Sequence, residues 1–287
     1  MTETVDIVRT VADLRARVRY WRDQGLTVAL VPTMGALHAG HASLVTAALD
    51  LADRVVASIF VNPTQFGVNE DFDRYPRREA EDARTLAESG CHLLYAPAVA
   101  EMYPDGFATK VQVAGVSEGL CGAVRPGHFE GVSTVVAKLL LQAQPHLALF
   151  GEKDWQQLAV IRRMVRDLDL PVEVVGVPTL READGLALSS RNAYLSPAER
   201  AIAPALHAVL LRVAAGLRRG ETAGALCRQG TEDLLAAGFL SVDYLEVRDG
   251  QTLAPLDRLE RPARVLVAAR LGGARLIDNL AVAPDAG

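Results

Sequence analysis

The feature of this chain that most constrains its fold is a repeated alternation of short apolar runs and helix-like segments over roughly the first 180 residues. Runs rich in Val, Ile and Leu, typical of buried strands, occupy residues 27–32, 55–61, 92–95, 147–150 and 172–177. Helical spacing and stop signals predict helices at residues 41–52, 78–88, 131–142 and 154–168. Continuous apolar strands separated by helices indicate a parallel sheet covered on both faces. We therefore predict an α/β fold, a Rossmann-like doubly wound parallel sheet.

The pattern changes after Thr179, which predicts a second, smaller α+β C-terminal domain. The segment Ser196-Pro197-Ala198-Glu199 is typical of a helix start, with serine at the N-cap and proline at the first helical position. We expect one long helix from there to about Leu217 and another at residues 223–236. Strands are predicted at residues 242–247, 264–269 and 275–281, with Gly272-Gly273 as a hairpin turn between the last two. The expected domains are residues 1–179 and 180–287.

Composition excludes several classes of partner. A formal net charge of −5 on 287 residues gives no general attraction for nucleic acid or anionic lipid, so we expect neither nucleic acid nor membrane as a partner. The N-terminus lacks the basic start and apolar run of a signal peptide. The most apolar stretch, residues 131–150, is interrupted by Lys138 and Pro145. Three widely spaced cysteines match no zinc site and suit a reducing compartment, so we expect a cytoplasmic protein.

A candidate phosphate site follows the first predicted strand, in the loop Pro32 to His41. Its glycines let the backbone approach a ligand, and the helix start offers free N–H groups and a positive dipole end. His38 and His41 are three residues apart, so both rings project from the same side of the first helical turn. Two ring donors there can bind phosphate oxygens as charge builds up in nucleotidyl transfer.

Two other interpretations of the histidines stay open. They can cap the helix, or they can bind a metal, although the loop offers no acid or cysteine as a third ligand. The chain has neither a Walker lysine motif nor a GxGxxG fingerprint.

Further positive groups follow later strands. Gly151-Glu152-Lys153-Asp154 comes directly after a predicted strand and opens a helix, which places one of only three lysines at a strand carboxyl end. Ser189, Ser190 and Arg191 offer two hydroxyls and a guanidinium, a suitable clamp for a polyphosphate. Each segment alone is also compatible with an ordinary solvated loop.

Taken together, these segments resemble the pantoate–β-alanine ligase (pantothenate synthetase) family. The similar stretches are VPTMGALHAGHASL, IFVNPTQFG, DFDRYPR, RPGHFEGVSTVVAKL, FGEKDWQQL and READGLALSSRN, in order within residues 31–192. The resemblance implies that ATP and pantoate form a pantoyl adenylate and pyrophosphate, and that β-alanine then releases pantothenate and AMP. It also implies Mg²⁺ with the ATP, a homodimer, ATP and pantoate binding by residues 1–179, and a lid role for residues 180–287.

The resemblance also implies roles for individual residues. It assigns ATP contacts to Met34, Gly35, His38, Gly40, His41, Gly151, Glu152, Lys153, Asp154, Leu180, Leu188, Ser189, Ser190 and Arg191. His41 takes the proton-donor role with His38 as its phosphate-binding companion, while Lys153 and Arg191 act on the phosphates. Gln65 and Gln157 are the expected substrate ligands, because an amide can bond both hydroxyls and carboxylate. Asp82 and Glu81 are the expected magnesium contacts, and Tyr75 and Arg125 are further contributors.

Two other functions compete with this interpretation. A nucleotidyltransferase with the same His-x-Gly-His motif would act on a phosphorylated alcohol, and it would need extra basic residues for that phosphate. The loop from Asn62 to Gln65 is neutral. A non-catalytic relative that senses nucleotide or binds RNA would need a basic patch, which this composition does not provide.

Overall fold

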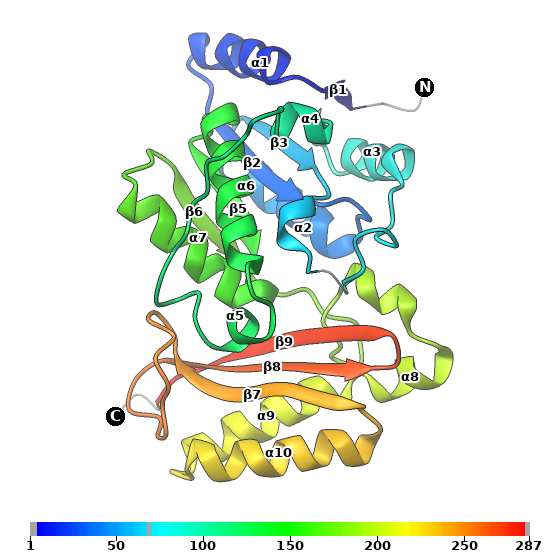
Figure 1. Ribbon diagram of the computed structural model, residues 1–287, viewed down its shortest axis with the longest axis vertical. Helices are drawn as coiled ribbons and strands as arrows, with labels where there is room; N and C mark the ends of the chain where they lie inside the picture. The colour runs from blue at the N-terminus through cyan, green and yellow to red at the C-terminus, as the bar shows by residue number, and fades with distance from the viewer. Residues whose placement is uncertain (1–4, 68–69, 285–287) are drawn as a thin grey trace. The chain divides into compact units, whose positions relative to one another are not determined.

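The computed structural model describes residues 5–67 and 70–284, and the chain forms two compact units (Figure 1). The N-terminal unit comprises residues 1–117, 125–152 and 160–178. The C-terminal unit comprises residues 118–124, 153–159 and 179–287. Two short segments from the middle of the sequence thus belong to the C-terminal unit.

The N-terminal unit contains a six-stranded sheet in the order β1-β4-β3-β2-β5-β6, and all neighbouring strands are parallel. The strands are β1 (Asp6–Val8), β2 (Val28–Thr33), β3 (Arg54–Ile59), β4 (Leu93–Tyr95), β5 (Leu147–Gly151) and β6 (Glu173–Val177). The strand order reverses between β2 and β5, which is the topological switch point of a Rossmann-like sheet. The predicted doubly wound fold is confirmed.

Helices cover both faces of this sheet. They are α1 (Val11–Asp23), α2 (Ala39–Leu49), α3 (Glu79–Glu88), α4 (Val99–Met102), α6 (His128–Ala143) and α7 (Trp155–Asp167), with the short 3-10 turns η1 (Pro63–Gln65) and η2 (Glu152–Asp154). Alternate strand residues point to opposite faces. Ala29 and Val31 of β2 share a buried cluster with α2 and α3. The other face of β2 meets α1 and α6. No prediction covered β1 and α1, although Leu14, Val18 and Trp21 already show helical spacing.

The C-terminal unit pairs helices with an antiparallel sheet in the order β7-β8-β9. Its elements are α5 (Leu120–Val124), η3 (Ser190–Tyr194), α8 (Pro197–Ile202), α9 (Ala205–Arg218), α10 (Ala223–Ala237), β7 (Ser241–Asp249), β8 (Ala263–Leu271) and β9 (Ala274–Val282). Inward side chains of the strands and of α9 form one buried cluster. The hairpin at Gly272, with φ of +53°, joins β8 to β9 as predicted. The α+β prediction is confirmed.

The predicted continuous helix from Pro197 to Leu217 is wrong in one respect. It is two helices, because Pro204 has no N–H for a helical hydrogen bond and its ring clashes with the preceding turn.

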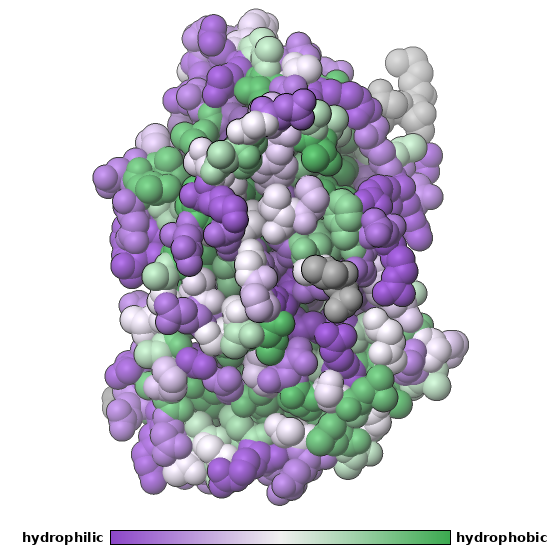
Figure 2. All heavy atoms as spheres, in the orientation of Figure 1, coloured by the Kyte–Doolittle hydropathy of each residue, from purple (hydrophilic) through white to green (hydrophobic). Residues whose placement is uncertain are grey.

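Within the described residues, the stretch Pro197–Arg218 has the length and composition that would allow it to cross a membrane. Its buried side chains Leu206, Val209, Leu210 and Val213 are at most 2% exposed and belong to the core of the C-terminal unit. That packing is typical of a core helix. On the face drawn in Figure 2, hydrophobic and hydrophilic residues are interspersed.

Candidate active site

The loop of the two histidines lies at the switch point of the parallel sheet. β2 ends at Thr33, and its neighbour β5 ends at Gly151. Both strands run in the same direction, so the segments that follow them leave the same edge of the sheet. Ligands of doubly wound sheets bind outside the carboxyl ends of the strands where the order reverses. The residues predicted from Met34 to His41 and at Gly151 therefore occupy the place where this fold binds ligands.

The two histidine rings cap helix α2. The Nδ1 atom of His38 accepts the N–H of Gly40 at 3.1 Å, and Nδ1 of His41 accepts the N–H of His38 at 3.3 Å. The ring centroids are 4.2 Å apart. The capping interpretation from the sequence is therefore realised. Because Nδ1 accepts a hydrogen bond, the proton of each neutral ring is on Nε2, so each ring caps the helix through one nitrogen and carries its N–H on the other.

The loop before these histidines is held by Asp82 of α3. The Asp82 side chain is buried, and its two oxygens accept the N–H groups of Ala36 and Leu37 at 3.0 and 2.8 Å. Its neighbour Glu81 is exposed and pairs with Arg78 at 3.5 Å. No group of three potential metal ligands occurs among residues 5–67 and 70–284.

Gln65, the first predicted substrate ligand, belongs to a network centred on Asn62. The Asn62 side chain is 1% exposed, and its Nδ2 donates to Gln65 Oε1 at 2.9 Å and to the Gly131 carbonyl at 3.1 Å. Its Oδ1 accepts from the Tyr103 hydroxyl at 2.8 Å and from the Thr64 hydroxyl at 3.0 Å. Asn62 thereby orients the Gln65 amide. Sequence reasoning had treated Asn62 only as part of a motif.

Gly131 allows α6 to approach this turn. A Cβ at Gly131 would lie 2.4 Å from the Thr64 carbonyl oxygen, which is closer than real Cβ contacts come. Only glycine fits there without displacing η1. Its role is steric, and no sequence signal other than the residue type indicated it.

Arg125 supports the same turn from another side. Its guanidinium binds Glu70 through two hydrogen bonds of 2.6 Å, and its Nη1 lies 2.9 Å from Nε2 of His128. The His128 Nδ1 lies 2.9 Å from the Gln65 carbonyl, so this ring donates through Nδ1 and accepts through Nε2. Burial alone would raise the pKa of Glu70, but the hydrogen bonds and charge of Arg125 hold that pKa below its usual value. Tyr75 is buried and contacts Phe66 edge-on, so it packs behind the turn.

Lys153 belongs to the C-terminal unit and lies in the 3-10 turn η2, directly before α7. Its side chain is 18% exposed, and Nζ is 3.7 Å from Asp154. Its carbonyl accepts from Asn279 Nδ2 at 2.8 Å, although the two residues are 126 positions apart. Asn279 Oδ1 in turn accepts from Arg264, whose guanidinium stacks 3.5 Å from the centroid of Trp155. Residues of β8 and β9 therefore fix the backbone at Lys153, and sequence reasoning missed all of them.

The two adjacent glutamines of α7, Gln156 and Gln157, differ in burial. Gln156 is 4% exposed and holds residues 118–121: its Nε2 donates to the Glu118 and Gly119 carbonyls, and its Oε1 accepts from Cys121 N–H at 3.0 Å. Gln157, the predicted substrate ligand, is half-buried. Gln156 thus holds the segment 118–121 in place.

Residues Leu180 to Arg191 form a compact loop within the C-terminal unit. The N–H of Leu188 donates to the Leu180 carbonyl at 3.0 Å, and Ser189 Oγ accepts from Arg191 N–H at 3.3 Å at the start of η3. Arg181 anchors the loop through two hydrogen bonds, 2.6 and 2.9 Å, to Asp278, whose side chain is 2% exposed. The structure thus brings these predicted nucleotide contacts together, and sequence reasoning missed the Arg181–Asp278 pair that holds them.

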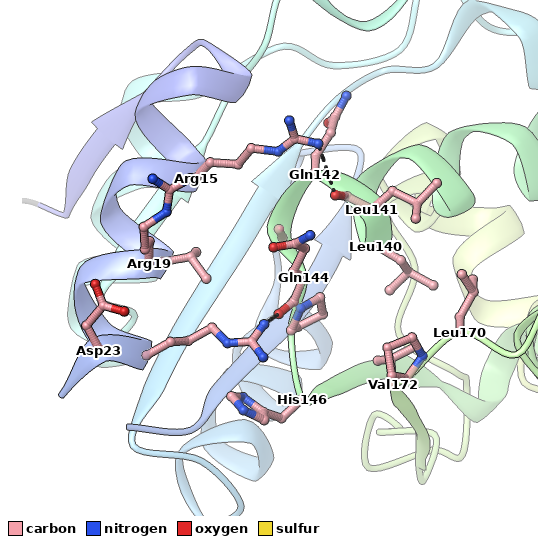
Figure 3. A pocket seen from close by; sticks show the side chains of 15 residues that line it. Arg15, Arg19, Asp23, Leu140, Leu141, Gln142, Gln144, His146, Leu170 and Val172 are labelled. Atoms are coloured by element: carbon pink, nitrogen blue, oxygen red, sulfur yellow. Dashed lines mark hydrogen bonds between the residues drawn. The ribbon is translucent and has the colours of Figure 1, made fainter. Parts of the chain in front are cut away.

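A separate cavity of about 610 Å³ lies between α1 and the end of α6 (Figure 3). Arg15 and Arg22 of α1 donate to carbonyl oxygens at the end of α6 at 3.3 and 2.8 Å. They satisfy helix-end carbonyls that lack partners within the helix. His146, which lines the cavity, accepts the N–H of Val28 at the first residue of β2. The cavity is therefore at the amino-terminal edge of the sheet, away from the histidine loop.

Comparison with known proteins identifies the family of this chain. The family described as pantoate-beta-alanine ligase matches residues 6–281. The chain belongs to the pantoate–β-alanine ligase family. The pantothenate synthetase of Paramagnetospirillum magneticum is 68% identical, over 99% of this chain and 100% of the relative.

Solved structures of this ligase family share the whole fold. The pantothenate synthetase of Thermus thermophilus has a TM-score of 0.91 at 53% identity, covering 98% of this chain and 100% of that one. A Francisella tularensis pantoate-beta-alanine ligase, in complex with beta-gamma ATP and beta-alanine, has a TM-score of 0.82 at 32% identity, covering 96% and 97%. The chain is an enzyme with ligase activity, as the sequence indicated.

Proposed function

We propose that this ligase condenses pantoate with β-alanine in an ATP-dependent reaction through an enzyme-bound pantoyl adenylate. The observation that carries the proposal is the His38–His41 loop at the switch point of the sheet, in a chain that matches the ligase family over residues 6–281. The Francisella tularensis relative, complexed with beta-gamma ATP and beta-alanine, supports the choice of substrates.

The first step joins pantoate to AMP. A pantoate carboxylate oxygen attacks the α-phosphorus of ATP, and the bond to the β-phosphate oxygen breaks to release pyrophosphate. We assign His38 and His41 to phosphate oxygens through their Nε2–H groups, which remain donors while Nδ1 caps the helix. Lys153 and Arg191 neutralise the departing pyrophosphate, and Ser189 and Ser190 donate to phosphate oxygens. The backbone from Met34 to Gly40 and from Gly151 to Asp154, with Leu180 and Leu188, completes the ATP contacts.

The second step forms the amide bond. The β-alanine nitrogen attacks the acyl carbon of the adenylate, AMP leaves with the bonding electron pair, and the nitrogen loses its proton. Gln65 and Gln157 are assigned to pantoate, because an amide both donates to a carboxylate and accepts from a hydroxyl. No protein nucleophile is needed, since the mixed anhydride already carries a good leaving group. Catalysis then depends on alignment and charge stabilisation.

Asn62 is expected to act by positioning Gln65. In Asn62→Ala, the Gln65 amide and the Tyr103 hydroxyl lose their buried partner, which costs about 1–3 kcal/mol of stability. We expect a higher KM for pantoate and a nearly unchanged KM for ATP, measured with thermal unfolding in parallel. A variant with unchanged pantoate KM would contradict the positioning role. Thr85→Ala, which removes a helix-surface hydroxyl bonded to its own helix, is the control.

Magnesium is expected to accompany ATP. Asp82 and Glu81 fit a shared metal site poorly, because Asp82 is buried with both oxygens accepting amide hydrogen bonds, whereas Glu81 is exposed beside Arg78. Mg²⁺ usually keeps several waters and binds substrate phosphates with one or two carboxylates.

Three properties stay predictions from family resemblance and composition. These are the homodimer, the cytoplasmic location, and the division of roles between residues 1–179 and 180–287. The alternative nucleotidyltransferase activity has no supporting observation here, because the turn from Asn62 to Gln65 carries only uncharged side chains, whereas a phosphorylated substrate would need basic ones.

The reaction is tested by mixing purified protein with ATP, Mg²⁺, pantoate and β-alanine and measuring products by mass spectrometry. We expect pantothenate and AMP in equal amounts, and pantoyl adenylate when β-alanine is omitted. Pyrophosphate release that requires a phosphomonoester in place of pantoate would favour the nucleotidyltransferase. ATP binding without any product would indicate a non-catalytic protein.

A further inference from the structure

We infer that Asp82 is a positioning residue for the histidine loop: its buried carboxylate holds two successive loop amides and so sets the place of His38 and His41. This inference rests on the proposed roles of the two histidines. It differs from the magnesium role that family resemblance implied for Asp82.

The loop has a conformation that needs external support. Gly35 has φ of +84° and Ala36 has φ of +52°, so two successive residues are left-handed. Glycine adopts this conformation freely, but for alanine the Cβ crowds the backbone. A non-glycine residue stays left-handed only where its surroundings stabilise it. At Ala36, the hydrogen bond from its N–H to Asp82 Oδ2 supplies such stabilisation.

Side chains bind three consecutive amides of this loop. The Gly35 N–H donates to Thr33 Oγ1 at 3.2 Å, and the Thr33 hydroxyl donates to the Ser58 carbonyl on β3 at 2.7 Å. The amides of Ala36 and Leu37 donate to the two Asp82 oxygens at 3.0 and 2.8 Å. The loop is thus fixed to β3 on one side and to α3 on the other. Leu37 directly precedes His38, so the last fixed amide adjoins the first capping histidine.

The fit between the loop and the carboxylate is tight. A Cβ at Gly35 would lie 2.9 Å from Asp82 Oδ2 and 3.2 Å from Ile59 Cγ2. The side chain at position 35 must therefore be absent for the carboxylate to reach the amides. Gly35 leaves room for the Asp82 carboxylate, and the carboxylate in turn holds the loop amides.

The geometry explains Asp82 without a metal. Asp82 is 3% exposed, whereas the Glu81 side chain is 64% exposed and pairs with Arg78, the N-cap residue of the same helix. Successive helical residues project about 100° apart, so the two carboxylates face different surroundings. An acceptor-only carboxylate matches two N–H donors, whereas an amide side chain would direct its own donor at one of them.

The test compares Asp82→Asn with Glu88→Gln, which removes one charge from an exposed site on the same helix. Hydrogen exchange of the Ala36 and Leu37 amides is measured first, without substrates. We expect faster exchange at these two amides in Asp82→Asn alone, while thermal unfolding shows that both variants are folded. Unchanged exchange at both amides would overturn the inference, whatever the reaction proves to be.

Activity across a magnesium titration separates positioning from metal binding. For Asp82→Asn we expect a kcat about 100-fold lower, as a misplacement near 1 Å can cause, with the magnesium midpoint unchanged. Recovery of activity at high Mg²⁺, with a shifted midpoint, would establish a metal ligand and overturn the inference. If the wild type itself makes no pantothenate, the proposed function fails, and the exchange measurement still decides the role of Asp82.

A second variant, at Gly35, tests the same contact between the loop and the Asp82 carboxylate. Gly35→Ala is expected to displace the Asp82 carboxylate and lower kcat comparably, because the new Cβ would lie 2.9 Å from Oδ2 and alanine is strained at a φ of +84°. Two mutations that disturb one shared contact are not additive. We expect the kcat of the double variant to be close to that of the less active single variant. If the fold reductions in kcat of the two single variants multiply in the double variant, the residues act independently, and this would contradict the inference.

Discussion

His41→Ala is expected to lower pantoate-dependent pyrophosphate–ATP exchange about 100- to 1,000-fold, the effect of removing one donor to a developing negative charge. The ring also accepts the His38 N–H through Nδ1 at 3.3 Å, so alanine removes a cap as well as the Nε2 donor. The exchange assay reports adenylate formation without the amide-forming step. Exchange close to the wild-type rate would remove His41 from the mechanism.

Two further variants at this position separate the two tasks of the ring. His41→Asn places an amide oxygen near the Nδ1 position and can retain the cap, but it does not reach the Nε2 position. His41→Gln places an amide N–H near Nε2. We expect Asn to restore thermal stability without exchange activity, and Gln to restore part of the activity. Recovery of activity with Asn would indicate that the cap alone matters.

Lys153→Met is expected to lower the same exchange rate by a similar factor of about 100 to 1,000, because it removes the ammonium assigned to the departing pyrophosphate. Stability should change by less than about 1 kcal/mol, since the ionic contact of Nζ with Asp154 is long, at 3.7 Å. The hydrogen bond from Asn279 reaches the Lys153 backbone and is kept in the variant. Methionine preserves most of the side-chain volume.

Lys110→Met is the matched control, because Lys110 is 70% exposed and pairs with Glu130 outside the proposed site. Lys110→Met should show pyrophosphate–ATP exchange at the wild-type rate. Lys153→Arg retains the charge with a different shape and should recover part of the rate. Equal rates in Lys153→Met and Lys110→Met would show that Lys153 does not act on the phosphates.

Sequence reasoning found the elements of the sheet because their signals are local. Val28 to Pro32 is an unbroken apolar run, and helix α2 follows it with Leu44, Val45 and Ala48 on its buried side. Ser196 caps α8 through a hydrogen bond from Glu199 N–H, as the short motif indicated. Helix α1 was missed although its pattern was present, with Leu14, Val18 and Trp21 buried along one face.

The supporting residues of the site could not be found in the same way. Asn62, Asp82 and Asp278 act through partners far along the chain, such as Gly131, Ala36 and Arg181. A single buried polar residue leaves no periodic signal, and its partner depends on which strands become neighbours. The capping role of the histidines required backbone angles, which the spacing alone does not provide.

The chain's own pattern of residues was sufficient to establish an α/β sheet, the order of its motifs and the ligase family, because apolar periodicity and contiguous motifs are properties of neighbouring residues. The folded structure was required to show that Asp82 binds loop amides and that Asn62 orients Gln65. These contacts arise only when distant segments are brought within hydrogen-bonding distance, about 3 Å, and that proximity is set by packing and not by spacing along the chain.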